Sequence, residues 1–312
     1  MDYQNTFQSV FDDLNFSPTK MFREGPRFFV VGGTYKGEKA IFKADVEDPK
    51  DGNRRAYLKL RREAAFLDSG ELSHIPAFYA KGDQEGFFWL LEEWVPGESQ
   101  EMGDSTFLIK DSFFTQDNLD FCLEFLTVLH QMPQENKSPK FKEFKEKFSK
   151  RYSLKDYAGL IASDKEKLVG KKLMDKVDDF IDRRHGIFDS NQKVIAHHEF
   201  YAPHIFVSGD EFSVIDWENV GWGNPAYDFA ELWIRSFSHP DFQGELLARF
   251  RDIQEDKDVF DQLLSLEVVL QGLGNLKYFK VADIPEEQKV AEEVRTFLRT
   301  NIDRVLAKDG RF

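Results

Sequence analysis

The chain has 312 residues, enough for two packed lobes, and 41% of them are apolar, including 32 Phe, which excludes a disordered composition. A single cysteine, Cys122, excludes an intramolecular disulfide framework. The sequence has no basic N-terminal region and no apolar run of about 20 residues, so we expect neither a secretory signal nor a membrane helix. We therefore expect a cytoplasmic protein. The net charge of −14 argues against a nucleic-acid-binding surface spread over the whole protein and is compatible with a cationic small-molecule substrate.

The first hundred residues predict a small lobe built mainly of β-strands. Its expected elements, in chain order, are an antiparallel sheet over residues 21–46 with a hairpin turn at Tyr35-Lys36-Gly37-Glu38, a helix from about Arg54 to Leu67, and strands at Pro76–Ala80 and Gly86–Trp94. Val95-Pro96-Gly97 then reads as a linker. The pattern therefore predicts an N-terminal lobe over residues 1–96.

The remaining residues, 97–312, predict a larger and mainly helical lobe. The expected helices are Asp117–His130, ending before Met132-Pro133, a Lys-rich helix with Phe141, Phe144, Phe148 and Tyr152 on one face, Asp164–Arg183, and further helices from Tyr227 to the C-terminus. Between them, Val194–Trp217 has the short apolar runs of a loop and hairpin. The Lys-rich helix could contact phosphates, but a solvated basic face over an apolar seam is the preferred interpretation.

Several residues of the first lobe have the order that phosphoryl transfer from ATP requires. Such transfer needs a lysine to hold the α- and β-phosphates and a carboxylate on a helix to hold that lysine. Lys43 ends the strand motif Ala40-Ile41-Phe42-Lys43, and Glu63 follows on the predicted helix. Glu93 and Val95 lie at a strand end, where a hinge backbone could pair with adenine. We therefore expect these residues to bind the nucleotide.

Three later segments carry a resemblance to a known family. They are His197-His198-Glu199 followed by His204, then Ile215-Asp216-Trp217-Glu218, then Gly223-Asn224-Pro225-Ala226-Tyr227-Asp228-Phe229-Ala230. This order is similar to the aminoglycoside phosphotransferase and choline kinase-like family, whose loop reads roughly H-G-D-x-x-x-x-N, then I-D-W or I-D-F-E, then G-x-P-x-x-D-x-A. The last segment matches most closely. The resemblance covers about residues 20 to 235.

The resemblance implies a fold, cofactors and residue roles. The implied fold is α+β and protein-kinase-like, with two lobes: a small antiparallel sheet with one main helix, and a larger, mostly helical lobe. The implied cofactors are ATP and Mg²⁺, with Asp216 as a metal ligand and His204 at the position of the second ligand. Glu199 stands at the position of the catalytic aspartate, and His197 would brace the loop. Asp228 would accept hydrogen bonds from the loop backbone.

Glu199 and His204 depart from the pattern of that family, which has Asp and Asn there. A glutamate keeps the negative charge but reaches about one methylene further, and a misplacement of about 1 Å can cost on the order of 10²-fold in rate. An imidazole nitrogen favours softer ions than an amide oxygen does, so Mn²⁺ becomes an alternative to Mg²⁺. His204 could instead be a cation beside the phosphates when protonated, or a packed loop residue in a degenerate site.

Three functional hypotheses follow from these residues. The first is an ATP-dependent phosphotransferase acting on a hydroxyl of a small molecule. A positively charged small molecule would suit the acidic chain. The second is a pseudokinase-like protein that binds nucleotide without turnover, and the third is nucleotidyl transfer on the same fold. The acceptor cleft is expected between the helices of residues 135–190 and the segment after 235. Candidates to line it, because aromatics and acids suit a cationic ligand, are Trp217, Glu218, Trp222, Glu231 and Trp233. A place in the core or on the surface is the preferred interpretation of each.

Overall fold

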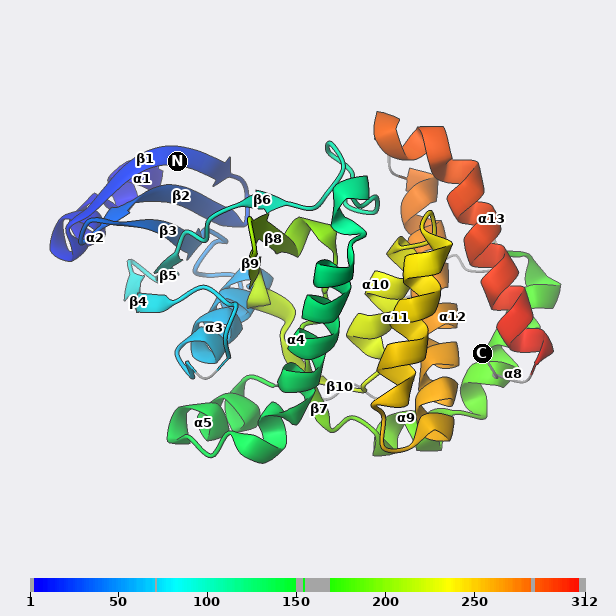
Figure 1. Cartoon of the computed structure of the whole chain (residues 1–312). Helices are drawn as coiled ribbons and strands as arrows, with labels where there is room; N and C mark the ends of the chain where they lie inside the picture. The colour runs from blue at the N-terminus through cyan, green and yellow to red at the C-terminus, as the bar shows by residue number, and fades with distance from the viewer. Residues whose placement is uncertain (1–2, 71, 150–153, 155–168, 282–283, 309–312) are drawn as a thin grey trace. The chain divides into compact units, whose positions relative to one another are not determined.

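The computed structural model describes residues 3–70, 72–149, 154, 169–281 and 284–308 (Figure 1). The chain divides into two compact units, which are described separately below. The N-terminal unit comprises residues 1–98, 136–149 and 206–220, and the C-terminal unit comprises residues 99–135, 150–205 and 221–312. This division adds two later segments to the first unit. The single domain boundary predicted between residues 96 and 97 stays a prediction.

The N-terminal unit is built on a five-stranded antiparallel sheet with the order β1-β2-β3-β5-β4 (Figure 1). Its strands are β1 (Phe16–Glu24), β2 (Phe28–Tyr35), β3 (Glu38–Asp45), β4 (Phe78–Gln84) and β5 (Phe87–Glu93). The predicted hairpin turn is confirmed, because β2 and β3 pair in register from Tyr35 and Glu38 onward. Lys36 and Gly37 between them both have positive φ, as a tight two-residue turn requires. The sheet begins at Phe16, earlier than the predicted residue 21.

Two short N-terminal helices, and Phe7 between them, contribute aromatic side chains to one face of this sheet. They are α1 (Tyr3–Thr6) and α2 (Gln8–Leu14), and the sequence pattern did not predict them. The ring of Phe42 in β3 lies 5.3 Å from that of Phe7 and 4.9 Å from that of Phe11, measured between centroids. Because side chains alternate along a strand, Ile41 and Lys43 belong to the opposite face of the sheet. This alternation places Lys43 away from the apolar core.

The helix α3 (Arg55–Leu67) packs against β5 and against the short helix η3 (Trp217–Asn219). The prediction of this helix is confirmed, and its apolar positions Ala56, Leu60, Ala64 and Leu67 are all buried. Trp217 stacks on Phe66 with 4.5 Å between ring centroids, and its indole N–H donates to the carbonyl of Val214. Trp217 is fully buried, which confirms the preferred interpretation as a core residue and rules it out as a residue that lines a cleft. Its large ring completes the core beneath α3 instead.

Further elements complete the N-terminal unit or mark its boundary. They are β6 (Glu98–Ser99), α5 (Pro139–Lys147), β8 (Ile205–Ser208) and β9 (Glu211–Val214), of which the three strands form a sheet in the order β6-β8-β9. Helix α5 is the predicted Lys-rich helix. Phe141 and Phe144 are buried while Lys142 and Lys147 are exposed, which confirms an apolar seam under a solvated basic face. Tyr152, also assigned to that face, lies outside the described residues.

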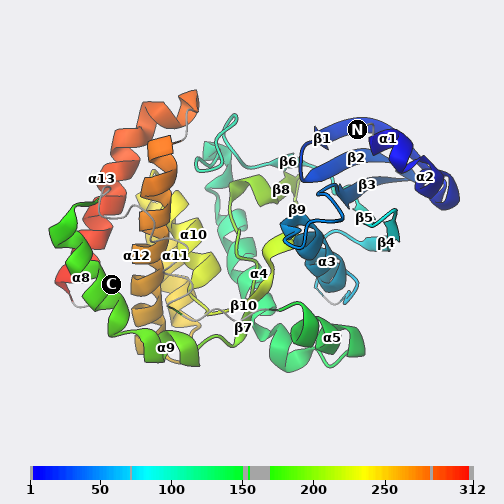
Figure 2. The same ribbon diagram turned by 180° about the vertical axis from the view of Figure 1, so that it is seen from behind.

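The C-terminal unit is mainly helical (Figures 1 and 2). Its elements are η1 (Asp111–Phe113), α4 (Gln116–Glu135), α8 (Lys171–Asp182), α9 (His185–Ser190), β7 (Val194–Ala196), η2 (Ala202–His204), β10 (Gly221–Gly223), α10 (Tyr227–Arg235), α11 (Pro240–Asp252), α12 (Lys257–Val281) and α13 (Pro285–Ala307). Helix α12 contacts α10, α11 and α13, while α4 packs on β7. The helical pattern predicted from Tyr227 onward is confirmed.

Two helices of this unit, α4 and α8, have boundaries that differ from the predicted ones. Helix α4 continues through Pro133 to Glu135, so the prediction that it ends before Met132 is wrong. Proline removes only one N–H donor from the last turn, and the burial of Met132 keeps that turn packed. The helix predicted over Asp164–Arg183 is found as α8, while residues 164–168 lie outside the described part of the chain.

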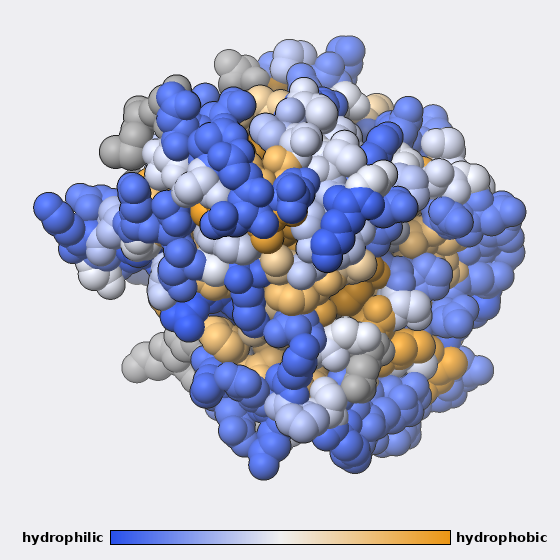
Figure 3. Space-filling model, turned by 90° about the vertical axis from the view of Figure 1, so that its left-hand side faces the viewer, coloured by the Kyte–Doolittle hydropathy of each residue, from blue (hydrophilic) through white to orange (hydrophobic). Residues whose placement is uncertain are grey.

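The charged composition of the chain is visible on its surface. Hydrophilic residues cover most of the face shown in Figure 3, with apolar patches between them. Within the described ranges, no helix combines the length and the apolar character needed to cross a membrane.

Candidate functional site

Lys43 is the centre of a charged cluster in the N-terminal unit. Its Nζ lies 2.8 Å from Oε1 of Glu63 in α3 and 2.8 Å from Oε1 of Glu92 in β5. Both glutamates are nearly inaccessible to solvent, with 2% and 3% of their surface exposed. The predicted ion pair between Lys43 and Glu63 is therefore confirmed as a contact. The contact of Glu92 with Lys43 was not predicted. It arises because β5 pairs with β3, which places Glu92 opposite Ile41.

Burial and charge act in opposite directions on this cluster. Burial would lower the pKa of Lys43, but Glu63, Glu92 and Asp216 together raise it well above its usual value, so the ammonium stays charged. Burial raises the pKa of Glu63 and of Glu92, while Lys43 opposes that rise. Two carboxyl groups thus contact one ammonium group, and a third acts on it through its charge. Such an excess of acidic groups favours the arrival of a cation.

Asp216 follows β9 in an unusual backbone conformation. Its φ is +66°, in the left-handed region that non-glycine residues seldom adopt. The N–H of the next residue, Trp217, donates to Oε1 of Glu63 at 3.2 Å. The carboxylate of Glu63 therefore contacts both Lys43 and the backbone beside Asp216. This shared partner links the position of the lysine to the position of the aspartate.

The loop that begins at His197 is held by a buried carboxylate in the C-terminal unit. Asp228, in the first turn of α10, accepts the N–H of His197 at 2.7 Å and the N–H of His198 at 2.8 Å, one with each oxygen. Nδ1 of the fully buried His197 accepts the N–H of Glu199 at 3.2 Å. The predicted role of Asp228 is confirmed. The contact of His197 agrees with the bracing role that the resemblance implied.

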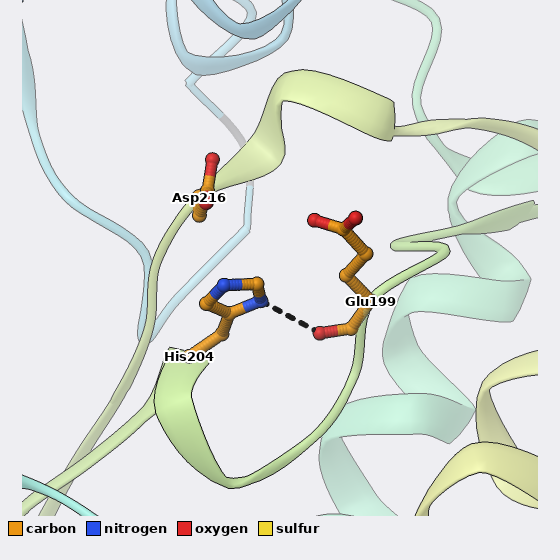
Figure 4. A group of neighbouring side chains, drawn as sticks. All are labelled: Glu199, His204 and Asp216. Carbon is orange, nitrogen blue, oxygen red and sulfur yellow. Dashed lines mark hydrogen bonds between the residues drawn. The ribbon is translucent and has the colours of Figure 1, made fainter. Parts of the chain in front are cut away.

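His204 is tied to the same loop through its ring. Nδ1 of His204 lies 2.9 Å from the backbone carbonyl of Glu199 (Figure 4). A carbonyl oxygen only accepts hydrogen bonds, so Nδ1 carries the hydrogen, and in the neutral ring Nε2 then has the lone pair. Metal-binding histidines are commonly oriented in this way, by a hydrogen bond from the nitrogen that does not bind the metal. The ring of His204 thus has the tautomer that suits a ligand.

The sequence-predicted site residues fall into two groups, one in each unit. Lys43, Glu63, Glu93, Val95 and Asp216 belong to the N-terminal unit, and His197, Glu199 and His204 belong to the C-terminal unit. Within the first group, Glu93 is fixed by Ala77, to which its backbone N–H donates at 2.9 Å and from which its side chain accepts at 3.1 Å. Val95 is buried. The strand end predicted to pair with adenine is therefore well anchored.

The candidates to line the acceptor cleft differ in how deeply they are buried. Trp217 and Trp233 have 0% and 5% of their surface exposed, so both are core residues, as the preferred interpretation has it, and neither lines a cleft. Large aromatic rings gain most free energy when they are buried in a core. Trp222, Glu218 and Glu231 are half-buried and remain candidates.

The loop contact of Asp228 gives a pH-dependent prediction. Burial raises the pKa of Asp228 to about 7, although the two backbone N–H donors favour the ionised form. Between about pH 4 and pH 7 the folded protein keeps a proton that the unfolded chain has lost, so this group stabilises the fold at low pH and loses that effect as pH rises. Asp228→Asn should lower the free energy of unfolding at every pH, by about 1–3 kcal/mol or more.

The difference between wild type and Asp228→Asn should shrink as pH rises from 4.5 to 7, by roughly 1 kcal/mol per pH unit, and stay constant above. Denaturant unfolding of both proteins at several pH values measures it. A difference that does not change with pH would contradict the raised pKa.

Known proteins share the sequence pattern and the fold of this chain. Residues 24–263 match the model of a family described as the phosphotransferase enzyme family. The structure of amicoumacin kinase hAmiN in complex with AMP-PNP, Ca²⁺ and Ami is similar with a TM-score of 0.61 at 14% sequence identity, over 97% of this chain and 94% of that chain. This likeness shows the fold and confirms the predicted kinase-like α+β class.

Two other solved structures are similar at lower scores. One is a choline/ethanolamine kinase family protein from Mesorhizobium loti, with a TM-score of 0.49, 15% identity and coverage of 97% of this chain and 99% of that chain. The other is a thermostable mutant of aminoglycoside phosphotransferase APH(4)-Ia in a ternary complex with AMP-PNP and hygromycin B, with a TM-score of 0.49, 10% identity and coverage of 97% and 98%. A search of curated proteins found no match.

Proposed function

The chain belongs to the phosphotransferase enzyme family, and from this premise we propose that it transfers the γ-phosphoryl group of ATP to a hydroxyl group of a small molecule in the cytoplasm. The observation that carries the proposal is the buried contact of Lys43 with Glu63, whose carboxylate also binds the backbone beside Asp216. The similar amicoumacin kinase structure contains the ATP analogue AMP-PNP and Ca²⁺, which supports a nucleotide and a divalent cation here.

Lys43 is proposed to bind the phosphates of the nucleotide. An ammonium group has three N–H donors, and Glu63 and Glu92 accept two of them, which leaves one for a phosphate oxygen. The two carboxylates hold the lysine in place before the nucleotide arrives, so little conformational entropy is lost on binding. The backbone of Glu93 and Val95 is proposed to pair with adenine. All these residues belong to the N-terminal unit.

A divalent cation would be held by the carboxylate of Asp216, with His204 as the proposed second ligand. The residues fit such an ion, because carboxyl groups outnumber the one ammonium group around Lys43 and His204 has its hydrogen on Nδ1. Carboxylate oxygen suits Mg²⁺ and imidazole nitrogen suits Mn²⁺, so either ion is compatible. When bound, the ion would neutralise negative charge on the phosphates.

Glu199 is proposed to orient the acceptor hydroxyl and to take its proton. The acceptor oxygen forms a bond to the γ-phosphorus while the bond from that phosphorus to the β,γ-bridging oxygen breaks, and ADP leaves. His197 and Asp228 hold the backbone around Glu199, so the carboxylate is positioned without a cost at the moment of reaction. His197 and Asp228 are positioning residues in this account.

A second candidate function is nucleotide binding without turnover. The replacement of both Asp and Asn of the family motif by Glu199 and His204 favours it, because those positions serve the transfer step. The cluster around Lys43 would be retained in either case. Only a measurement of transfer separates the two functions.

The direct test is turnover with and without Asp216. Asp216→Asn keeps a residue that tolerates the left-handed backbone and removes the negative charge. We expect wild type to convert ATP in the presence of Mg²⁺ or Mn²⁺ and a library of hydroxyl and amine compounds, and Asp216→Asn to lose at least about 10²-fold in rate. Asp210→Asn, exposed in the neighbouring turn, is the matched control and should resemble wild type. Wild-type turnover no faster than that of Asp216→Asn would refute the enzyme proposal.

A further inference from the structure

Glu92 has one carboxylate oxygen for which the described residues supply no hydrogen-bond donor. Its Oε1 lies 2.8 Å from Nζ of Lys43. Its Oε2 is buried, and no residue in the described part of the chain donates a hydrogen bond to it. Only 3% of Glu92 is exposed, so bulk water does not solvate this oxygen. Buried polar atoms in native proteins nearly always have a partner, which is then a bound water or a ligand.

The position of Glu92 in the sheet indicates which ligand that is. In the pairing of β3 with β5, Glu92 lies opposite Ile41 and Leu90 lies opposite Lys43. Because side chains alternate, Glu92 shares a face with Ile41 and Lys43, while the next residue on the other face, Leu91, belongs to the apolar core. Glu92 also directly precedes Glu93. It therefore stands between the lysine proposed for the phosphates and the backbone proposed for adenine.

We propose that Oε2 of Glu92 accepts a hydrogen bond from the exocyclic amino group of the nucleobase, and that Glu92 thereby selects ATP over GTP. This inference rests on the proposed function. An ionised carboxylate can only accept, and the 6-amino group of adenine donates. Guanine has a carbonyl oxygen at the same position, so two acceptors would face each other. The contact with Lys43 fixes the orientation of the carboxylate and leaves Oε2 for the base.

The size of the effect follows from the same reasoning. A site that has a buried hydrogen-bonding group rejects an analogue that lacks the matching group, because both partners are then left unpaired. We expect GTP to bind wild type roughly 10²-fold more weakly than ATP. Purine riboside triphosphate, which lacks the 6-amino group, should be weakened in the same direction.

Calorimetric binding of the three nucleotides to wild type and Glu92→Gln tests the proposal. Glutamine has the same size and presents both an acceptor and a donor, so Glu92→Gln should bind ATP and GTP within about threefold of each other. Lys43 keeps Glu63 as a partner in this variant, and thermal unfolding checks that it is folded. Glu92→Met, which has no strong acceptor, is the second variant and should also lose the preference. Glu38→Gln, exposed on β3, is the control that should keep it.

The outcomes are distinguishable from failure of the proposed function. Equal affinity of wild type for ATP and GTP, or an unchanged preference in Glu92→Gln, would refute the role of Glu92 and would indicate that a buried water satisfies Oε2. Nucleotide binding itself would still stand in both cases. No binding of any of the three nucleotides would refute both the inference and the proposed function.

Discussion

Replacing Lys43 with methionine should weaken ATP binding by about ten- to a hundred-fold and lower kcat/KM for transfer by about 10²- to 10³-fold. The variant loses the positive charge that is proposed to bind the phosphates. It also leaves Glu63 and Glu92 buried without their cation, which adds negative charge or forces protonation of a carboxyl group. Glu63→Gln should have a smaller effect, because Glu92 still holds the lysine. Calorimetry gives the affinities, and steady-state kinetics gives kcat/KM.

Lys39→Met is the matched control for this experiment. Lys39 lies on the same strand and the same face as Lys43, but it is exposed. We expect its ATP affinity to stay near that of wild type. Equal ATP affinities of Lys43→Met and Lys39→Met would mean that Lys43 does not bind the phosphates, and the assignment of the nucleotide site would fail.

Glu199→Gln should lower kcat by about 10²- to 10⁴-fold while the dissociation constant for ATP stays nearly unchanged. The amide cannot take the proton of the acceptor hydroxyl, whereas the residues proposed to bind the nucleotide belong to the N-terminal unit. Glu199→Asp should retain more activity than Glu199→Gln, because it keeps the negative charge and shortens the side chain by one methylene. The split between kcat and nucleotide affinity distinguishes a role in transfer from a role in folding.

Glu124→Gln, an exposed substitution on α4, is the control for the Glu199 variants. Its kcat should match wild type. If Glu199→Gln also transferred phosphate at the wild-type rate, another group would have to orient the acceptor, and the role of Glu199 would be wrong.

Local patterns predicted much of the fold. The turn at Lys36-Gly37 and the apolar spacing of α3 depend on neighbouring residues, and both are confirmed. The end of α4 was wrong because a local rule about Pro133 was outweighed by the burial of Met132, which depends on distant residues. The helices α1 and α2 are too short to show a clear periodicity, so their contribution to the core could not be read from sequence.

The candidate site was predicted in part for the same reason. The order of Lys43 and Glu63 along the chain indicated an ion pair, and the structure contains it. The second partner, Glu92, depends on the register between β3 and β5, which the sequence does not specify without the pairing. Trp217 was a candidate for the cleft because aromatic residues suit a cationic ligand, but its ring stacks on Phe66 of α3, in the core. The order of residues along the chain indicated which residues to consider, while non-local packing decided which of them contact one another.

Identification of the products formed from ATP tests the central claim most directly. Wild-type protein is incubated with ATP, Mg²⁺ and a library of small hydroxyl compounds, and the products are followed by ³¹P NMR and mass spectrometry. The account predicts ADP in equal amount to an acceptor that has gained one phosphoryl group on oxygen. Pyrophosphate with a nucleotidylated acceptor, or unchanged ATP with every compound and with Mn²⁺ as well, would contradict it.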